Sequence, residues 1–178
     1  MRKALFFLGI MNDADIEWLS DAGERIRVSA GTVLIREGRP IDNLFVVLEG
    51  CLMVTTAASG SRPVARLRSG EIIGEISFAD ARPPSATVTA EQDAVVLAVP
   101  RKTLELKLQD PPFAARFYRA LSVFLADRLR QTTSQLGYGT PREDDSTDSA
   151  IEIDPQLLDQ TSLAGARFDW LLKRLRGA

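Results

Sequence analysis

The residues best suited to bind a ligand lie between Gly70 and Ala90, in the stretch GEIIGEISFADARPPSATVTA. Its pattern predicts a strand, a glycine turn, a short helical turn, a loop and a second strand. At the turn, Gly74 would allow a close approach to the main chain, and amide groups near Ile76 and Ser77 can face an anion. The stretch therefore favours binding of a negatively charged molecule, and the other elements are expected to support it.

Enzymatic chemistry is disfavoured by what the composition lacks. The 178-residue chain contains no histidine and a single cysteine, Cys51. The absence of histidine excludes serine–histidine and cysteine–histidine catalysis as well as histidine-ligated metal sites. A single cysteine forms no intrachain disulfide, and Cys51 is expected to be a small buried hydrophobic residue in a reducing compartment. We therefore predict a cytoplasmic protein with no catalytic residue, no metal site and no cofactor.

The charge balance and the N-terminus exclude two further classes. The formal net charge is -2 at pH 7, whereas a general polyanion binder needs a basic face. The N-terminal run MRKALFFLGIM superficially resembles a signal peptide, but it stops at Asn12-Asp13 and no cleavage pattern follows. No stretch approaches the roughly 20 apolar residues of a membrane-spanning helix. We predict an amphipathic N-terminal helix packed on the core.

The first hundred residues predict a helix followed by about eight short strands. Asn12 or Asp13 can cap the helix, which should end near Gly23. Close spacing of strands and turns indicates a sandwich or a barrel. Four glycines fall where corners need a positive φ, namely Gly31, Gly38, Gly50 and Gly70. The expected strands lie near residues 26–28, 32–35, 44–48, 51–55, 64–67, 72–73, 85–90 and 94–99.

After Pro100 the pattern becomes helical. Thr103 can cap a short helix that ends near Gln109, and Asp110-Pro111-Pro112 should open a second helix that continues to about Leu136. The long helix carries two apolar stripes, which predict two partners: the barrel, and the same helix of a second chain. Packing of both stripes within the chain is the alternative. The stripes are Phe113, Phe117, Leu121 and Phe124, and Tyr118, Leu121, Leu125, Leu129 and Leu136.

The C-terminal region predicts a linker and one more helix. Residues 142–149, REDDSTDS, are acidic and lack apolar side chains, so residues 137–155 should form a flexible linker. Residues 156–178 predict a basic amphipathic helix with Ser162 as a candidate cap. Such a helix can sit on its own barrel, on a partner protein or on an anionic membrane, and we favour the first two.

Residues 26–136 resemble a cyclic nucleotide-binding domain, most closely the catabolite activator protein type. The resemblance is carried by GTVLIREGRPIDNLFVVLEG at 31–50, by the stretch at 70–90 and by ADRLRQTTSQL at 126–136. It implies a mainly β fold with flanking helices, built on a double-stranded β-helix or jelly roll. This domain would occupy residues 1–136, before the linker and the C-terminal helical segment.

The resemblance also implies a ligand, cAMP or cGMP, and a role for particular side chains. Glu75 matches the acid that accepts a hydrogen bond from the ribose 2'-hydroxyl, and Ser85 matches a small residue at the phosphate. Thr132 and Thr133 match the pair with which the activator's long helix contacts adenine. The expected ligand-binding set is Gly74, Glu75, Ile76, Ser77, Arg82, Ser85, Ala86, Thr132 and Thr133.

One position departs from the family pattern. The family places a phosphate-binding arginine before the small-residue run, and here Pro84 stands in that place. Loss of such a charge-assisted contact costs about 1.5–3 kcal/mol. Arg82, two residues earlier, is the candidate to reach back to the phosphate. Weak binding, a different anionic ligand and no ligand are the open alternatives.

The resemblance to the activator does not extend to its DNA-binding unit. About forty residues follow the long helix, and they do not show the two helices and turn of a helix-turn-helix. We therefore expect no direct DNA binding. The leading hypothesis is a stand-alone regulatory module, dimeric through the long helix, that senses a cyclic nucleotide and signals to a protein partner through its C-terminal helix. The alternative is a ligand-free dimerisation and docking adaptor.

Overall fold

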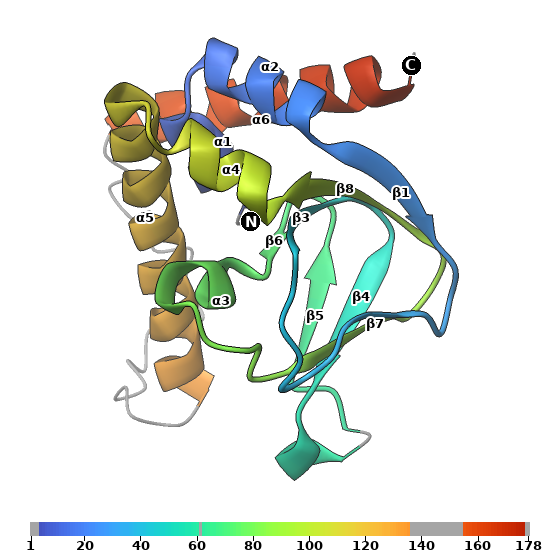
Figure 1. Ribbon diagram of the computed structural model, residues 1–178. Helices are drawn as coiled ribbons and strands as arrows, with labels where there is room; N and C mark the ends of the chain where they lie inside the picture. Colours follow the sequence, from blue (N-terminus) through green and yellow to red (C-terminus); the bar gives the residue numbers. More distant parts are fainter. Residues whose placement is uncertain (1–3, 61, 136–154, 177–178) are drawn as a thin grey trace.

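Two four-stranded antiparallel sheets pack into a jelly roll (Figure 1). The computed structural model describes residues 4–60, 62–135 and 155–176. The strand orders, β1-β8-β3-β6 and β2-β7-β4-β5, place strands that are distant in sequence side by side. The mainly β fold and the predicted strands are confirmed. Within the described residues the strands are β1 Glu24–Val28, β2 Val33–Ile35, β3 Asn43–Glu49, β4 Cys51–Thr55, β5 Ala65–Arg68, β6 Ile72–Ile73, β7 Thr87–Ala90 and β8 Ala94–Pro100.

Strand β3 shows how the sequence creates two hydrophobic cores. Successive side chains of a strand point to opposite faces. Phe45 and Val47 face the core between the two sheets, whereas Leu44, Val46 and Leu48 face the helices. All five side chains are buried, and burial of each contributes roughly 1.5–3 kcal/mol. The continuous apolar run therefore reflects a strand that is covered on both sides.

The corners of the roll use glycine as expected. Gly50 joins β3 to β4 with φ of 93°, and a Cβ there would lie 2.6 Å from the carbonyl oxygen of Asp93. No other residue type fits that corner without displacement of the main chain. The positive φ expected at four corner glycines is confirmed for Gly31, Gly38, Gly50 and Gly70.

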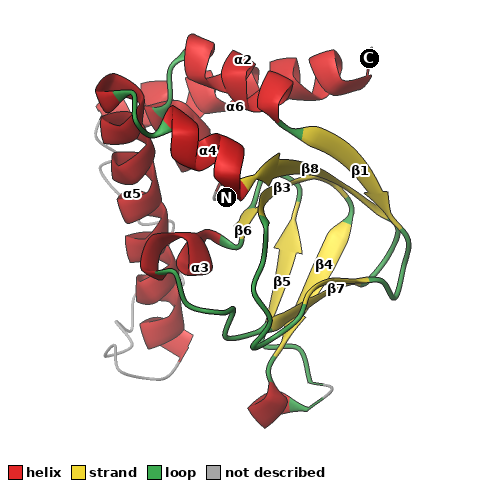
Figure 2. Ribbon diagram, viewed as in Figure 1, coloured by secondary structure: helices red, strands yellow, loops and turns green. Residues whose placement is uncertain are grey.

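Helices cover the outer face of the β1-β8-β3-β6 sheet, and the longest helix stands beside the roll (Figure 2). Asn12 caps the second helix and forms a capping box with Asp15, and the helix ends before Gly23 as expected. The N-terminal helix packs against both the longest and the last helix. The helices are α1 Ala4–Ile10, α2 Asp13–Ala22, α3 Glu75–Asp80, α4 Arg101–Lys107, α5 Pro111–Gln135 and α6 Pro155–Arg176, with a short 3-10 turn η1 at Ala57–Ser59.

Helix α4 starts earlier than predicted, whereas helix α5 starts where it was predicted. Helix α4 begins at Arg101, directly after Pro100, so Thr103 lies inside the helix and the prediction that it caps the helix is wrong. Proline fixes φ near the value of an N-cap residue, and the helix can start without a side-chain cap. Helix α5 begins at Pro111 as predicted. Its predicted end at Leu136 lies outside the described residues.

The C-terminal helix docks on its own chain. Its apolar face packs against α1 and α2, which selects one of the open alternatives for this amphipathic segment. The helix starts at Pro155, so Ser162 lies within it and the prediction of a cap at Ser162 is wrong. The rest of the predicted linker lies outside the described residues. The buried face consists of Ala164, Phe168, Leu171 and Leu175.

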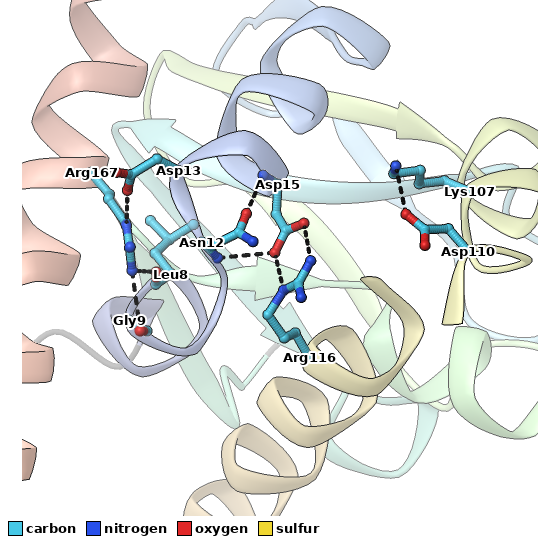
Figure 3. Close-up of polar contacts among 9 residues, drawn as sticks. All are labelled: Leu8, Gly9, Asn12, Asp13, Asp15, Lys107, Asp110, Arg116 and Arg167. Atoms are coloured by element: carbon cyan, nitrogen blue, oxygen red, sulfur yellow. Dashed lines mark hydrogen bonds and ion pairs between the residues drawn. The ribbon is translucent and has the colours of Figure 1, made fainter. Parts of the chain in front are cut away.

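Polar contacts fix the turn between α1 and α2 to the helices around it (Figure 3). Arg167 of α6 donates to the Asp13 carboxylate at 2.7 Å and to the carbonyl oxygens of Leu8 and Gly9 at 3.1 and 3.2 Å. These carbonyls lie at the end of α1, where helix oxygens lack intrahelical donors. Arg167 therefore supplies both charge and hydrogen bonds to this docking.

A buried ion pair joins α2 to the beginning of α5. Asp15 accepts hydrogen bonds from Nε and Nη2 of Arg116 at 2.6 and 2.8 Å, and one from the Asn12 amide at 2.9 Å (Figure 3). Burial raises the pKa of Asp15, but the hydrogen bonds and charge of Arg116 outweigh burial and lower the pKa below its ordinary value. The pair was not foreseen from the sequence. It fixes the N-terminal half of α5 against the helical layer.

The described residues were also compared with the requirements of a membrane-spanning helix and of a metal site. None of the helices described is both long and apolar enough to cross a bilayer. Among the residues that the structure describes, no group of three or more potential metal-ligating side chains occurs.

Candidate ligand-binding site

The stretch at 70–90 folds as a strand, a glycine turn, a one-and-a-half-turn helix and a loop that leads into β7. Gly74 caps α3 with φ of 89°. A Cβ at this position would lie 2.6 Å from Cδ1 of Ile41 and 3.3 Å from the carbonyl oxygen of Asn43. The left-handed backbone therefore favours glycine, whereas the flexible end of the Ile41 side chain can move aside. The turn places Glu75 at the start of α3, beneath α5.

Glu75 is held by an arginine from the long helix. Its side chain is only 2% exposed, and Nη1 of Arg128 donates a hydrogen bond to Oε1. The Arg128 side chain is 30% exposed and its guanidinium lies over the Phe124 ring, 5.9 Å from the centroid. Burial raises the pKa of Glu75 above its ordinary value, and the charge of Arg128 only partly opposes that shift. The ion pair therefore links the stretch at 70–90, which we call the cassette, to α5.

A small cavity lies beside this pair. Its volume is about 60 Å³, which is room for about two water molecules at ~30 Å³ each. Ligand pockets in proteins usually measure ~300–1,000 Å³. A nucleotide therefore fits only if residues of the lining move. Six of the expected ligand-binding residues line the cavity, namely Gly74, Glu75, Ile76, Ser77, Ser85 and Ala86.

The walls of the cavity come from several elements. Ile35, Val54, Ile73 and Val88 contribute apolar side chains from the roll, and Pro84 closes the cavity from the loop. The polar side chains of the lining, Glu75, Ser77, Ser85 and Arg128, come from the cassette and from α5. Such an arrangement suits a ligand with one apolar or flat part and one charged part.

Arg82 does not line this cavity. Its side chain is 83% exposed, with Nε 4.0 Å from the Asp80 carboxylate, and its amide donates to the same carboxylate at 3.0 Å. The Gly38 amide donates to the Pro84 carbonyl at 2.8 Å and thereby attaches the loop to the turn before β3. Because the loop is held in this way, Arg82 points into solvent. The structure does not bring it to the other expected site residues.

The two threonines of α5 are also outside the cavity lining. Both side chains are exposed, and their hydroxyls donate to carbonyl oxygens of their own helix. Thr132 donates to the carbonyl of Arg128 at 3.0 Å, and Thr133 to that of Arg130 at 2.8 Å. They lie about one turn beyond the point where α5 contacts the cassette.

Arg128 is the site residue that sequence reasoning missed. It precedes Thr132 by four positions, so the two lie on neighbouring turns of one helix face. That spacing, on the helix already expected to cover the ligand, was the available signal. The pairing itself joins residues 53 positions apart and leaves no local pattern.

A larger groove exists elsewhere, between α2 and α6. Its volume is about 420 Å³, and its walls include Ile16, Leu163 and Trp170. The charged groups there are already paired, Asp13 with Arg167 and Glu17 with Arg174. No unpaired polar group converges on this groove from its described lining, so size alone does not make it the candidate site.

Comparison with known proteins matches the region that contains the cassette. The family model described as "Cyclic nucleotide-binding domain" matches residues 25–110. The chain is 35% identical over 77 residues to a cAMP-dependent protein kinase regulatory subunit of Dictyostelium discoideum, a match covering 40% of this chain and 24% of that protein. It is 33% identical over 92 residues to a cyclic nucleotide-gated potassium channel of Mesorhizobium japonicum, covering 52% and 24%. The chain thus spans about a quarter of the length of these relatives.

Solved structures with a similar fold cover the whole roll. The N-terminal domain of a transcriptional regulator from Streptomyces coelicolor is 31% identical with a TM-score of 0.56, and the match covers 70% of this chain and 88% of that one. A cyclic nucleotide-binding domain from Methylobacillus flagellatus has a TM-score of 0.67 at 22% identity, covering 75% and 80%. The second likeness supports the fold alone. The fold, the cassette and these matches together show that the chain belongs to the cyclic nucleotide-binding domain family.

Proposed function

We propose that the chain is a regulatory module that binds a cyclic nucleotide, cAMP or cGMP, beside Glu75 and transmits binding to α5. The observation that carries the proposal is the ion pair between Glu75 of the cassette and Arg128 of α5 at the edge of a cavity. Similarity to a cAMP-dependent protein kinase regulatory subunit supports the choice of ligand. In this role the chain works without catalysis and without contacting DNA itself.

Ligand entry would change the position of α5. The cavity is too small for a nucleotide, so the Glu75–Arg128 contact has to open as the ligand enters. A ribose hydroxyl can then donate to the Glu75 carboxylate. Binding shifts α5 only if the two positions of the helix bind the ligand with different free energies. In the position that α5 has here the cavity is too small for the ligand, and this would supply the difference.

The outward face of α5 would form a dimer. Tyr118 and Leu129 are 50% and 65% exposed, and Leu125 between them is half-buried. The other stripe is buried against the chain's own helical layer. An exposed apolar stripe on a long helix fits the same stripe of a second copy through an isologous contact. The position of α5 would thereby be communicated between two protomers.

The C-terminal helix would carry the signal to a protein partner through its exposed edge. Its apolar face is occupied by α1 and α2, but Leu163 and Trp170 remain 45% and 40% exposed. Tryptophan is enriched among residues that dominate protein interfaces. The proposed partner surface is therefore the exposed edge of α6 that lines the groove beside α2.

A ligand-free adaptor is the second candidate. Pro84 stands where the family places arginine, Arg82 is directed into solvent, and the cavity is small. These observations favour a pocket that has lost its ligand while the roll and α5 still serve dimerisation and docking. The two candidates share the same dimer and differ only in ligand binding.

Calorimetric titration separates the two candidates. We expect cAMP or cGMP at up to millimolar concentration to release or absorb heat with the native chain, and Pro84→Arg to bind at least ten times more tightly because it adds a charge-assisted phosphate contact. Lys102→Ala, an exposed substitution on α4, is the control and should bind like the native chain. No heat with either nucleotide for the native chain and for Pro84→Arg would establish the adaptor.

A further inference from the structure

The cavity lining contains a single positive charge that could neutralise a phosphate. Of the described residues that line it, Arg128 is the one cation and Glu75 the one acid. A cyclic phosphate carries a negative charge, and burying an unpaired anion is costly. A nucleotide bound here would add a second anion to a site whose single cation is already paired.

Neighbouring arginines do not supply the missing charge. Arg82 is directed into solvent beside Asp80. Arg101 donates to the Ser77 carbonyl at 3.1 Å and to Glu105 at 2.8 Å, and its guanidinium lies over the Phe78 ring. Arg101 is therefore fixed on the far side of α3. A phosphate in the cavity has to recruit the cation that is already there.

Arg128 is suited to exchange one anion for another. A guanidinium presents five donors in a planar fork that matches phosphate as well as carboxylate. The side chain is partly exposed, whereas Glu75 is buried. Contact with the Phe124 ring, one helical turn earlier, can persist while the tip of the side chain swings.

Glu75 can tolerate the loss of its partner. The ribose 2'-hydroxyl can donate a hydrogen bond to the carboxylate, and burial already favours the protonated form of this group. The exchange therefore replaces a carboxylate–arginine pair with a phosphate–arginine pair and a hydroxyl–carboxylate hydrogen bond.

We propose that Arg128 binds the nucleotide phosphate in the role that Pro84 cannot fill, and that it leaves Glu75 to do so. The proposal rests on the proposed cyclic nucleotide function. It makes the helix that covers the pocket, rather than the cassette loop, the source of the phosphate-binding cation. It also gives ligand charge, and not only ligand size, control over the position of α5.

The test compares cAMP with adenosine, which has the same base and ribose but no phosphate. Arg128→Gln alone would leave a buried unpaired carboxylate, so the substitution is made in a Glu75→Gln background. We expect Glu75→Gln/Arg128→Gln to bind cAMP about ten- to a hundredfold more weakly than Glu75→Gln, because a charge-assisted contact is lost. Adenosine affinity should stay within about twofold, because no phosphate contact is involved. Arg119→Gln in the same background, an exposed cation on α5, should change neither affinity.

A rescue variant makes the test specific to phosphate. Pro84→Arg added to Glu75→Gln/Arg128→Gln should restore the preference for cAMP over adenosine, because either arginine can neutralise the phosphate. Circular dichroism and thermal unfolding of each variant establish that the fold is intact. An equal loss of cAMP and adenosine affinity on removal of Arg128, or no loss of either, would overturn the proposal.

Failure of this proposal differs from failure of the proposed function. If the native chain binds cAMP and removal of Arg128 has no effect on the preference for phosphate, the function stands and Arg128 is a structural partner of Glu75. If only variants with Pro84→Arg bind, the cavity accepts a nucleotide but Arg128 does not replace the missing arginine. If no variant binds, both proposals are wrong.

Discussion

Two neighbouring residues of the cassette have different roles. Gly74 provides the left-handed backbone of the turn, and Glu75 provides a buried carboxylate. Gly74 was expected to permit a close approach of ligand, and the structure adds that its φ is in the left-handed region and that Ile41 packs over it. Glu75 was expected to meet a ribose, and the structure adds a pairing with Arg128. Local sequence pattern identified the positions, but their partners come from distant segments and could not be inferred.

Substitution of Gly74 should destabilise the fold. Gly74→Ala places a Cβ in a left-handed conformation, which costs about 1–2 kcal/mol, and within 2.6 Å of the flexible end of Ile41. Gly165→Ala in α6 is the matched control, because nothing lies within 4 Å of its Cβ. Alanine inside a helix should stabilise it by about 0.5–1 kcal/mol. Urea unfolding measures both, and equal effects at the two positions would contradict the assignment.

The titration of Glu75 should be visible in stability. Because burial raises its pKa above the ordinary value of 4.5, the folded chain retains this proton to higher pH than the unfolded chain. The stabilisation is complete below the unfolded-state value and is lost as pH rises through the folded pKa. We expect the unfolding free energy of the native chain, relative to Glu75→Gln, to decrease as pH rises above the ordinary value of 4.5, by at most ~1.4 kcal/mol per pH unit.

Urea unfolding across that pH range is the measurement. The difference between the two variants isolates Glu75 from Asp15, whose lowered pKa acts in the opposite direction at more acidic pH. A difference that is constant, or that grows in favour of the native chain with rising pH, would show that Arg128 outweighs burial at this carboxylate.

At the scale of elements, strands were more predictable than helix contacts. Alternation and glycine corners define β3, β4 and β8 locally, because each buried face follows from a period of two. An amphipathic helix such as α6 fits any apolar surface, so its pattern could not decide between its own chain and a partner. The cap predicted at Ser162 is wrong because α6 extends about two turns further towards its N-terminus.

Removal of a buried side chain from α6 tests whether this helix belongs to the cooperative fold. Phe168→Ala should lower the unfolding free energy by about 3–5 kcal/mol, because a buried aromatic ring leaves a cavity against α1 and α2. Asp169→Ala, its exposed neighbour, should change stability by less than about 0.5 kcal/mol. Chemical denaturation followed by circular dichroism makes the comparison. A small effect of Phe168→Ala would mean that α6 unfolds separately from the roll.

At the scale of the molecule, α5 has one face for its own chain and one for solvent. The inward stripe contains Phe113 and Phe117, both fully buried, and the outward stripe contains Tyr118 and Leu129. The sequence predicted both stripes, and the structure confirms the burial of the first. The second stripe follows a pattern that serves several kinds of contact, so the sequence alone did not specify its partner.

Charge on the outward stripe should separate the proposed dimer. We expect the native chain to sediment as a dimer and Tyr118→Glu/Leu129→Glu to sediment as a monomer, because two like charges would face each other across the symmetric contact. Leu106→Glu, also strongly exposed but on α4 and outside the outward stripe, is the control and should remain dimeric. Sedimentation velocity at several concentrations gives the result. A native chain that is monomeric throughout would contradict the dimer.

The two buried acids that hold α5 divide it into parts with different freedom. Asp15 pairs with Arg116 within the helical layer, whereas Glu75 pairs with Arg128, which lies twelve residues later, about 18 Å along the axis of α5. Of these two ion pairs, the Glu75–Arg128 pair lines the cavity. A ligand that opens the Glu75–Arg128 pair would leave the Asp15–Arg116 pair intact. Helix α5 would then rotate about its N-terminal end instead of sliding along its axis. Small displacements at the cavity would then grow towards the C-terminal end of the helix.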